Sequence, residues 1–141
     1  MMENIKQDIQ DLRIKSNAAF ISSVNEDGFP QTKCMLVLER DDMKVQWFST
    51  NLSSKHAQHF IKNPKASVYY CDEAQYKAAL FTGLMEVCTD HGTKAFLWQE
   101  GFEIYYPKGV DDEDYCVLKF TSDTVNYYHG ISNKTISIEE L

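Results

Sequence analysis

The chain has 141 residues, of which 43% are hydrophobic and 25% are charged; this size and composition are typical of a single soluble globular domain. Its formal net charge of −7 argues against a nucleic-acid partner, because affinity for DNA or RNA rests on many contacts between cations and phosphates. No apolar run approaches the roughly 20 residues of a membrane-spanning helix, so no membrane partner is expected. The four cysteines form no C-x-x-C pair and lie in apolar runs, which predicts reduced thiols in a cytoplasmic protein.

The first half of the chain predicts a helix, three strands and a second helix. Ile5, Ile9 and Leu12 recur at helical spacing, so an N-terminal helix is expected within residues 1–15. Apolar runs separated by turns predict three strands that pair in order as an antiparallel meander; these strands span residues 17–24, 31–39 and 44–49. Ser53 or Ser54 is a good N-cap for a helix that ends near residue 62, before a proline that cannot continue it.

The second half predicts more strands around one further helix and an irregular connector. In chain order we expect a strand hairpin, a helix, the connector and two strands over residues 66–71, 77–88, 91–99, 100–113, 115–121 and 125–128. The tail over residues 131–141 is expected to be loosely held. Six or seven short strands with two or three helices indicate a mostly β, α+β domain. We therefore predict that residues 1–141 form one small antiparallel β-barrel with flanking helices.

One cluster of polar and basic residues stands out from this acidic chain. It comprises Lys33, Ser49, Thr50, Ser54, Lys55 and His56. The first is a lone cation in an apolar strand, the next two end the following strand, and the others begin a helix. Fixed hydroxyls, backbone N–H groups at a helix start and nearby cations together suit a bound phosphate. The alternative is a solvated lysine beside an ordinary helix cap, but capping explains one serine rather than the whole cluster.

Other candidate sites are weaker. His56 and His59 are three residues apart on a predicted helix, and Cys88 and His91 form a C-x-x-H pair. Neither pair has a second pair at a suitable spacing, so we expect no metal site. The acidic run over residues 111–114 lacks the alternating ligands of a calcium loop and indicates a solvated turn.

The connector is rich in aromatic residues from Trp98 to Tyr106. An exposed aromatic segment of this kind often marks an interface or a ligand pocket. A loop that packs over the open end of the barrel is an equal alternative.

Several short motifs, in their order along the chain, resemble a known family. They are Gly28-Phe29-Pro30, Lys33-Cys34-Met35, Phe48-Ser49-Thr50-Asn51, Ser54-Lys55-His56, and the segments over residues 63–68 and 81–87. Together they resemble the FMN-binding split barrel of the pyridoxamine 5'-phosphate oxidase-like superfamily, and its general-stress-protein branch in particular. The resemblance covers about residues 10 to 130.

This resemblance implies a homodimer with FMN at the subunit interface. Lys33 would meet the phosphate or ribityl chain, and Cys34 and Met35 would lie along the flavin through their backbone. The resemblance also implies that the site is lined by Phe48, Ser49 and Thr50, that the phosphate is held by Ser54, Lys55 and His56, and that Trp98 or its neighbours reach across from the partner. The expected activity is an oxidoreductase that uses flavin for hydride or electron transfer to an unknown small substrate. The alternatives are a binding module that holds FMN or a related phosphorylated cofactor without turnover, and a structural dimer without cofactor.

Two departures from the family pattern limit what the resemblance implies. The true oxidase holds its substrate phosphate with arginine and histidine on a C-terminal strand, whereas this chain has no arginine after Arg40 and only His129 in residues 121–130. Oxidation of pyridoxine phosphate is therefore not expected. In addition, position 56 is histidine where a permanent cation is common, which predicts a pH-dependent affinity for phosphate.

Overall fold

The computed structural model describes residues 2–38 and 42–141. Its helices and strands are α1 (Met2–Lys15), β1 (Ala18–Val24), β2 (Pro30–Leu36), β3 (Val45–Asn51), α2 (Lys55–Lys62), β4 (Lys65–Asp72), β5 (Lys77–Cys88), α3 (His91–Leu97), β6 (Tyr115–His129) and β7 (Ser132–Ser137). Single 3₁₀ turns complete them: η1 (Glu73–Gln75), η2 (Phe102–Ile104), η3 (Gly109–Asp111) and η4 (Ile138–Glu140). No helix of these described ranges is long and apolar enough to cross a membrane.

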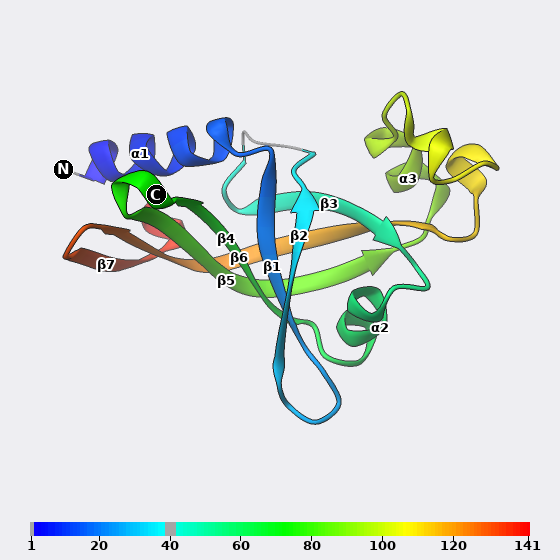
Figure 1. Ribbon diagram of the computed structural model, residues 1–141, viewed down its shortest axis with the longest axis horizontal. Helices are drawn as coiled ribbons and strands as arrows, with labels where there is room; N and C mark the ends of the chain where they lie inside the picture. Colours follow the sequence, from blue (N-terminus) through cyan, green and yellow to red (C-terminus); the bar gives the residue numbers. More distant parts are fainter. Residues whose placement is uncertain (1, 39–41) are drawn as a thin grey trace.

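The strands form one antiparallel sheet in the order β2-β1-β4-β5-β6-β3, and β7 pairs with the free side of β6. The sheet curls into a half-barrel, which brings its two edge strands, β2 and β3, next to one another. Helix α1 lies across one end of this half-barrel, whereas α2 and α3 lie at the other end (Figure 1). The predicted α+β architecture, a split antiparallel barrel with flanking helices, is confirmed.

The pairing of the third strand differs from the predicted meander. β3 pairs with β6, from Val45 opposite Thr121 to Asn51 opposite Tyr115, rather than with β2. In addition, β6 forms one continuous strand of 15 residues instead of the two predicted strands. Its first half lies between β3 and β5 and its second half between β5 and β7. The predicted strand over residues 31–39 ends at Leu36 within the described part, and residues 39–41 lie outside it.

A close approach between strands bends the sheet at its centre. The register of β5 against β6 shifts at Thr82 and Gly83. A Cβ atom on Gly83 would lie 2.1 Å from the carbonyl oxygen of Thr121. Only glycine allows this approach of the two backbones, so the residue at position 83 is fixed by the packing of β5 on β6.

Two apolar clusters stabilise the fold. The larger one fills the half-barrel and is covered by Ile9 and Leu12 of α1. The guanidinium group of Arg13 lies within it, 5.4 Å from the centre of the Tyr70 ring, and donates a 2.9 Å hydrogen bond to the carbonyl oxygen of Asp42. The smaller cluster packs the α3–η2 segment on the beginning of β6.

The C-terminal residues are more ordered than the sequence suggested. The expectation of a loosely held tail is wrong, because β7 pairs with β6 along its whole length. Ile136 and Ile138 are buried in the main cluster. Ile136 belongs to β7 and Ile138 begins the turn η4, and their apolar contacts with the main cluster fix the tail.

Candidate functional site

The candidate site lies at the start of α2, where the chain leaves edge strand β3. Ser54 is the N-cap of α2, and its Oγ accepts a 3.2 Å hydrogen bond from the backbone N–H of Ala57. Thr50 Oγ1 at the end of β3 lies 3.5 Å from the same oxygen. Because both contacts use Ser54 Oγ as the acceptor, its own hydrogen can be donated to a ligand. The first turn of α2 contains no acidic residue of its own, although the carboxylate of Asp114 lies just before it, on the backbone N–H of Ser53.

Helix α2 contains two neighbouring histidines on the side that faces the first strands of the sheet. His59 Nδ1 makes a 2.8 Å hydrogen bond with the buried hydroxyl of Ser23 on β1. The ring of His56 lies 5.8 Å from that of His59. Helix α2 is therefore fastened to β1 by the bond between His59 and Ser23.

His56 is partly buried and lies near other basic side chains, and both conditions affect its pKa. Its pKa is lowered from 6.5, first by burial and then by the charges of Lys33 and His59. His56 is therefore neutral at neutral pH when no anion is bound. Its Nε2 atom is buried and has no hydrogen-bond partner within the described residues.

The structure brings part of the predicted set together. Lys33 from edge strand β2 acts electrostatically on His56, and Thr50 lies beside Ser54. Lys55 is exposed at the first position of α2. Residues from edge strands β2 and β3 and from helix α2 thus meet at one place in the half-barrel. We call it the seam; it comprises Lys33, Thr50, Ser54, Lys55 and His56.

Other predicted residues occupy different positions. Met35 and Phe48 are buried in the main apolar cluster, so only their backbone groups can face a ligand. Ser49 is half-buried next to Phe48, and Cys34 is exposed on β2, opposite Phe20 of β1. The assignment of each of these residues to a cofactor stays a prediction.

Trp98 lies in the smaller cluster at the end of α3. Its ring stands nearly perpendicular to those of Phe102 at 5.6 Å and Tyr115 at 5.2 Å. This part of the aromatic connector therefore packs over the end of the sheet, as one of the two alternatives expected. Ile104 and Tyr105 in the same connector are exposed, so the connector also presents an apolar surface.

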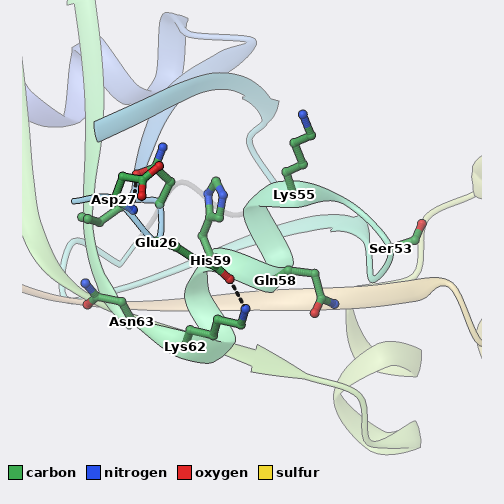
Figure 2. A pocket seen from close by; sticks show the side chains of 10 residues that line it. Glu26, Asp27, Ser53, Lys55, Gln58, His59, Lys62 and Asn63 are labelled. Atoms are coloured by element: carbon green, nitrogen blue, oxygen red, sulfur yellow. Dashed lines mark hydrogen bonds and ion pairs between the residues drawn. The ribbon is translucent and has the colours of Figure 1, made fainter. Parts of the chain in front are cut away.

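A hollow of about 580 Å³ opens beside α2, between the helix and the β1–β2 turn. Figure 2 shows it lined by an ion pair between Glu26 and Lys62, with Lys55 at the other end of the helix pointing away from that pair. Of the predicted cofactor residues, only Lys55 lines this hollow. The hollow and the predicted phosphate site therefore share only the start of α2.

No metal centre is visible in the described part of the chain. Within residues 2–38 and 42–141, no three His, Cys, Asp or Glu side chains gather around a common point. His91 Nδ1 makes a 2.7 Å hydrogen bond with Asp111 Oδ1 instead, and the Cys88 thiol lies 3.7 Å from a carboxylate oxygen of Glu86.

Sequence reasoning missed two residues of the acidic run, which was interpreted as a solvated turn. Asp112 is buried and accepts hydrogen bonds from the backbone N–H groups of Lys108 and Asp114. Asp114 binds the segment that leads into α2, through Asn51 and Ser53. No local sequence pattern predicts this contact, because it depends on the pairing of β3 with β6.

Comparison with known proteins identifies the family. The model of the family described as pyridoxamine 5'-phosphate oxidase like matches residues 2–141. The chain belongs to this family. No curated protein matches the chain in sequence.

Solved structures support the same conclusion. A Clostridium acetobutylicum protein related to general stress protein 26 of B. subtilis is 34% identical, with 99% of this chain and 98% of that chain covered and a TM-score of 0.89. General stress protein 26 from Bacillus anthracis is 20% identical, with coverages of 95% and 98% and a TM-score of 0.76. A heme binding protein from Mycobacterium smegmatis is 12% identical, with coverages of 96% and 58% and a TM-score of 0.72. The last two show the fold alone, and the resemblance to general stress proteins is confirmed.

Within this family fold, the seam has the chemistry of an anion site. Cations reach it from β2 and α2, a hydroxyl can donate to it from Ser54, and the first N–H groups of a helix lack partners inside that helix. Groups of these kinds bind a phosphate by several charge-assisted hydrogen bonds at once.

Proposed function

We propose that this protein binds FMN, with the phosphate at the first turn of α2, and that it acts as a flavin-dependent oxidoreductase on a small substrate. The observation that supports this most strongly is the convergence of Lys33, Ser54 and Lys55 at the seam of a family fold. Ser54 is positioned by its cap to Ala57, and Lys33 lies close enough to depress the pKa of His56. A dianionic phosphate would reverse that effect, because it favours the charged form of the imidazole.

The chain's own residues would orient the cofactor. Strand β2 pairs only with β1 in the described sheet, so the backbone groups on its other side can bond to a planar ring with polar edges. Cys34 and Met35 lie on that strand, which supports their predicted contact with the flavin through the backbone. Bound flavin would supply the hydride or electron transfer, and the protein would supply position and electrostatics.

We further propose a homodimer with the flavin at the interface. The outer side of the β1–β2 hairpin exposes Phe20 at 42% and Leu36 at 49%, with Cys34 directly opposite Phe20. Exposed apolar side chains grouped in this way are typical of an interaction surface. Trp98 of a partner subunit is the predicted contact from the other side. Sedimentation of the purified protein as a monomer would contradict this proposal.

Oxidation of pyridoxine phosphate is not proposed. The corresponding C-terminal strands are β6 and β7, and the chain has no arginine after Arg40 to hold a second phosphate. His129 is exposed at the end of β6.

The alternative function is a module that holds FMN, or another cofactor, without turnover. It is favoured by the likeness to a heme binding protein, since one fold hosts several functions. A visible absorption spectrum of the purified protein after FMN addition separates flavin from heme. Reduction of bound flavin by NADH or NADPH supports the oxidoreductase, whereas flavin that stays oxidised with every donor favours the binding module. A protein that binds no FMN contradicts the proposal.

A further inference from the structure

The segment that leads from β3 into α2 is held by a residue from a distant part of the chain. Asp114 lies directly before β6, and its carboxylate accepts hydrogen bonds from Asn51 Nδ2 at 2.8 Å and from the backbone N–H of Ser53 at 2.9 Å. The carbonyl oxygen of Asp114 accepts a third bond, of 2.7 Å, from the backbone N–H of Leu52. Asp114 thus holds three consecutive residues, Asn51, Leu52 and Ser53, through its side chain or its backbone.

These contacts act on the residues next to the N-cap. Ser53 immediately precedes Ser54, and the backbone N–H of Ser54 donates to the carbonyl oxygen of Asn51 at 3.0 Å. Fixing Asn51 and Ser53 therefore fixes the direction in which α2 begins. The pKa of Asp114 is lowered, first by the bond from Asn51 and then by bonds from Ser53. Its carboxylate is therefore ionised at neutral pH and able to accept at both oxygens.

The charge of Asp114 opposes the ligand that the site is proposed to bind. A carboxylate near a phosphate lowers its affinity by repulsion, so electrostatics alone would favour a neutral residue at this position. An acidic residue here is useful only if its hydrogen bonds outweigh its charge.

We propose that Asp114 is a positioning residue for the phosphate of the bound cofactor, acting through Asn51 and Ser53 on the start of α2. This inference rests on the proposed FMN function. A residue of the acidic run before β6 would thus support a site that lies at the start of α2, after β3.

The decisive variant is Asp114→Asn, because the two contributions predict opposite results for it. An amide has one acceptor oxygen, so one of the two side-chain bonds is lost and an NH₂ group faces a donor. The fold should persist, since the bond from Leu52 and the pairing of Asn51 with Tyr115 do not use this side chain. The affinity for FMN should fall by up to about tenfold, because only the part of the lost bond's free energy that orders the start of α2 affects binding. The affinity for riboflavin, which lacks the phosphate, should stay unchanged.

Glu113→Gln is the matched control. It removes the same charge one residue earlier, from an exposed side chain that makes no hydrogen bond in the described part of the chain. Its FMN affinity should equal or slightly exceed that of the wild type. Asn51→Ala is the second variant: it keeps the carboxylate and removes one donor, so FMN should bind more weakly and riboflavin equally well.

Titration of flavin fluorescence at fixed ionic strength gives all of these dissociation constants. The inference is overturned if the wild type binds FMN and Asp114→Asn binds it as tightly or more tightly. It is also overturned if FMN and riboflavin weaken equally, because the loss would not then be at the phosphate. If Asp114→Asn does not fold, Asn51→Ala decides in the same way. A wild type that binds no FMN refutes the proposed function itself, a result that the other outcomes do not resemble.

Discussion

Reversing the charge of Lys55 is the most direct test of the proposed phosphate site. Lys55 is exposed at the first position of α2, where its ammonium group would bond to a phosphate oxygen. Loss of one such charge-assisted bond costs about 1.5–3 kcal/mol. In Lys55→Glu the new carboxylate would also repel the phosphate, by about 1 kcal/mol for unit charges 4 Å apart in water. The two effects together predict an affinity for FMN that is lower by a factor of about 10² to 10³.

The same substitution should not harm the fold. A glutamate at the first turn interacts favourably with the helix dipole, by about 0.3–1 kcal/mol. The melting temperature without flavin should therefore stay the same or rise slightly. A loss of flavin binding can then be attributed to the site rather than to unfolding.

Lys62→Glu is the control at the other end of the same helix. Seven residues separate the two lysines, which places them about 10 Å apart along the axis, roughly one Debye length at physiological salt. Its partner Glu26 is also exposed, so the ion pair contributes little to stability. FMN affinity should change by no more than about threefold. Fluorescence titration with FMN and riboflavin measures both variants, and wild-type affinity for FMN in Lys55→Glu would show that the phosphate lies elsewhere. Equal losses in the two variants would show that only the net charge matters.

Three further results are expected. FMN at a hundred times its dissociation constant should stabilise the protein by about 2.7 kcal/mol, seen in calorimetry as a melting temperature about 9 °C higher; an unchanged value would contradict the site. Gly83→Ala should lower the free energy of unfolding by about 1–3 kcal/mol, because its Cβ would lie 2.1 Å from the Thr121 oxygen. Urea unfolding measures this loss, and a midpoint at the same urea concentration as the wild type would refute the close approach. The lowered pKa of His56 means that the unfolded chain binds its proton more readily, so flavin-free stability should fall as pH drops below 6.5. His56→Gln should flatten that part of the pH profile, and a profile identical to wild type would exclude the effect.

The local elements could be predicted because their signals are local. Ser54 before a short amphipathic segment and Pro64 after it delimit α2, which runs from Lys55 to Lys62. Strand partners could not be predicted in the same way. An apolar alternation specifies which face of a strand is buried but not which strand lies beside it. The sequence therefore could not show that β3 pairs with β6 rather than with β2. Within β7 only Ile136 is buried, and a single apolar residue in a polar segment does not distinguish a strand from a loose tail.

The residues of the candidate site could likewise be predicted only where their signals are local. Lys33, Thr50, Ser54 and Lys55 lie within a short stretch, and the motif order that identified the family includes them. Asp114 lies 63 residues from Asn51 along the chain, and only the tertiary pairing brings the two together. Sequence reasoning also could not show that Phe48 is a core residue, since the alternation of a strand leaves open which face a ligand meets.

The location of the site at the seam explains why its parts come from distant segments. A half-barrel has two edge strands, and here β2 and β3 are both edges of the same curled sheet. Helix α2 lies beside them: His59 bonds to Ser23 on β1, the neighbour of β2, and Asp114, directly before β6, fastens the helix start next to β3. A phosphate bound between Lys33 and Lys55 would add one more link across this seam. Binding of the phosphate would then be thermodynamically linked to the contact between β2 and α2, because the site depends on cations from both.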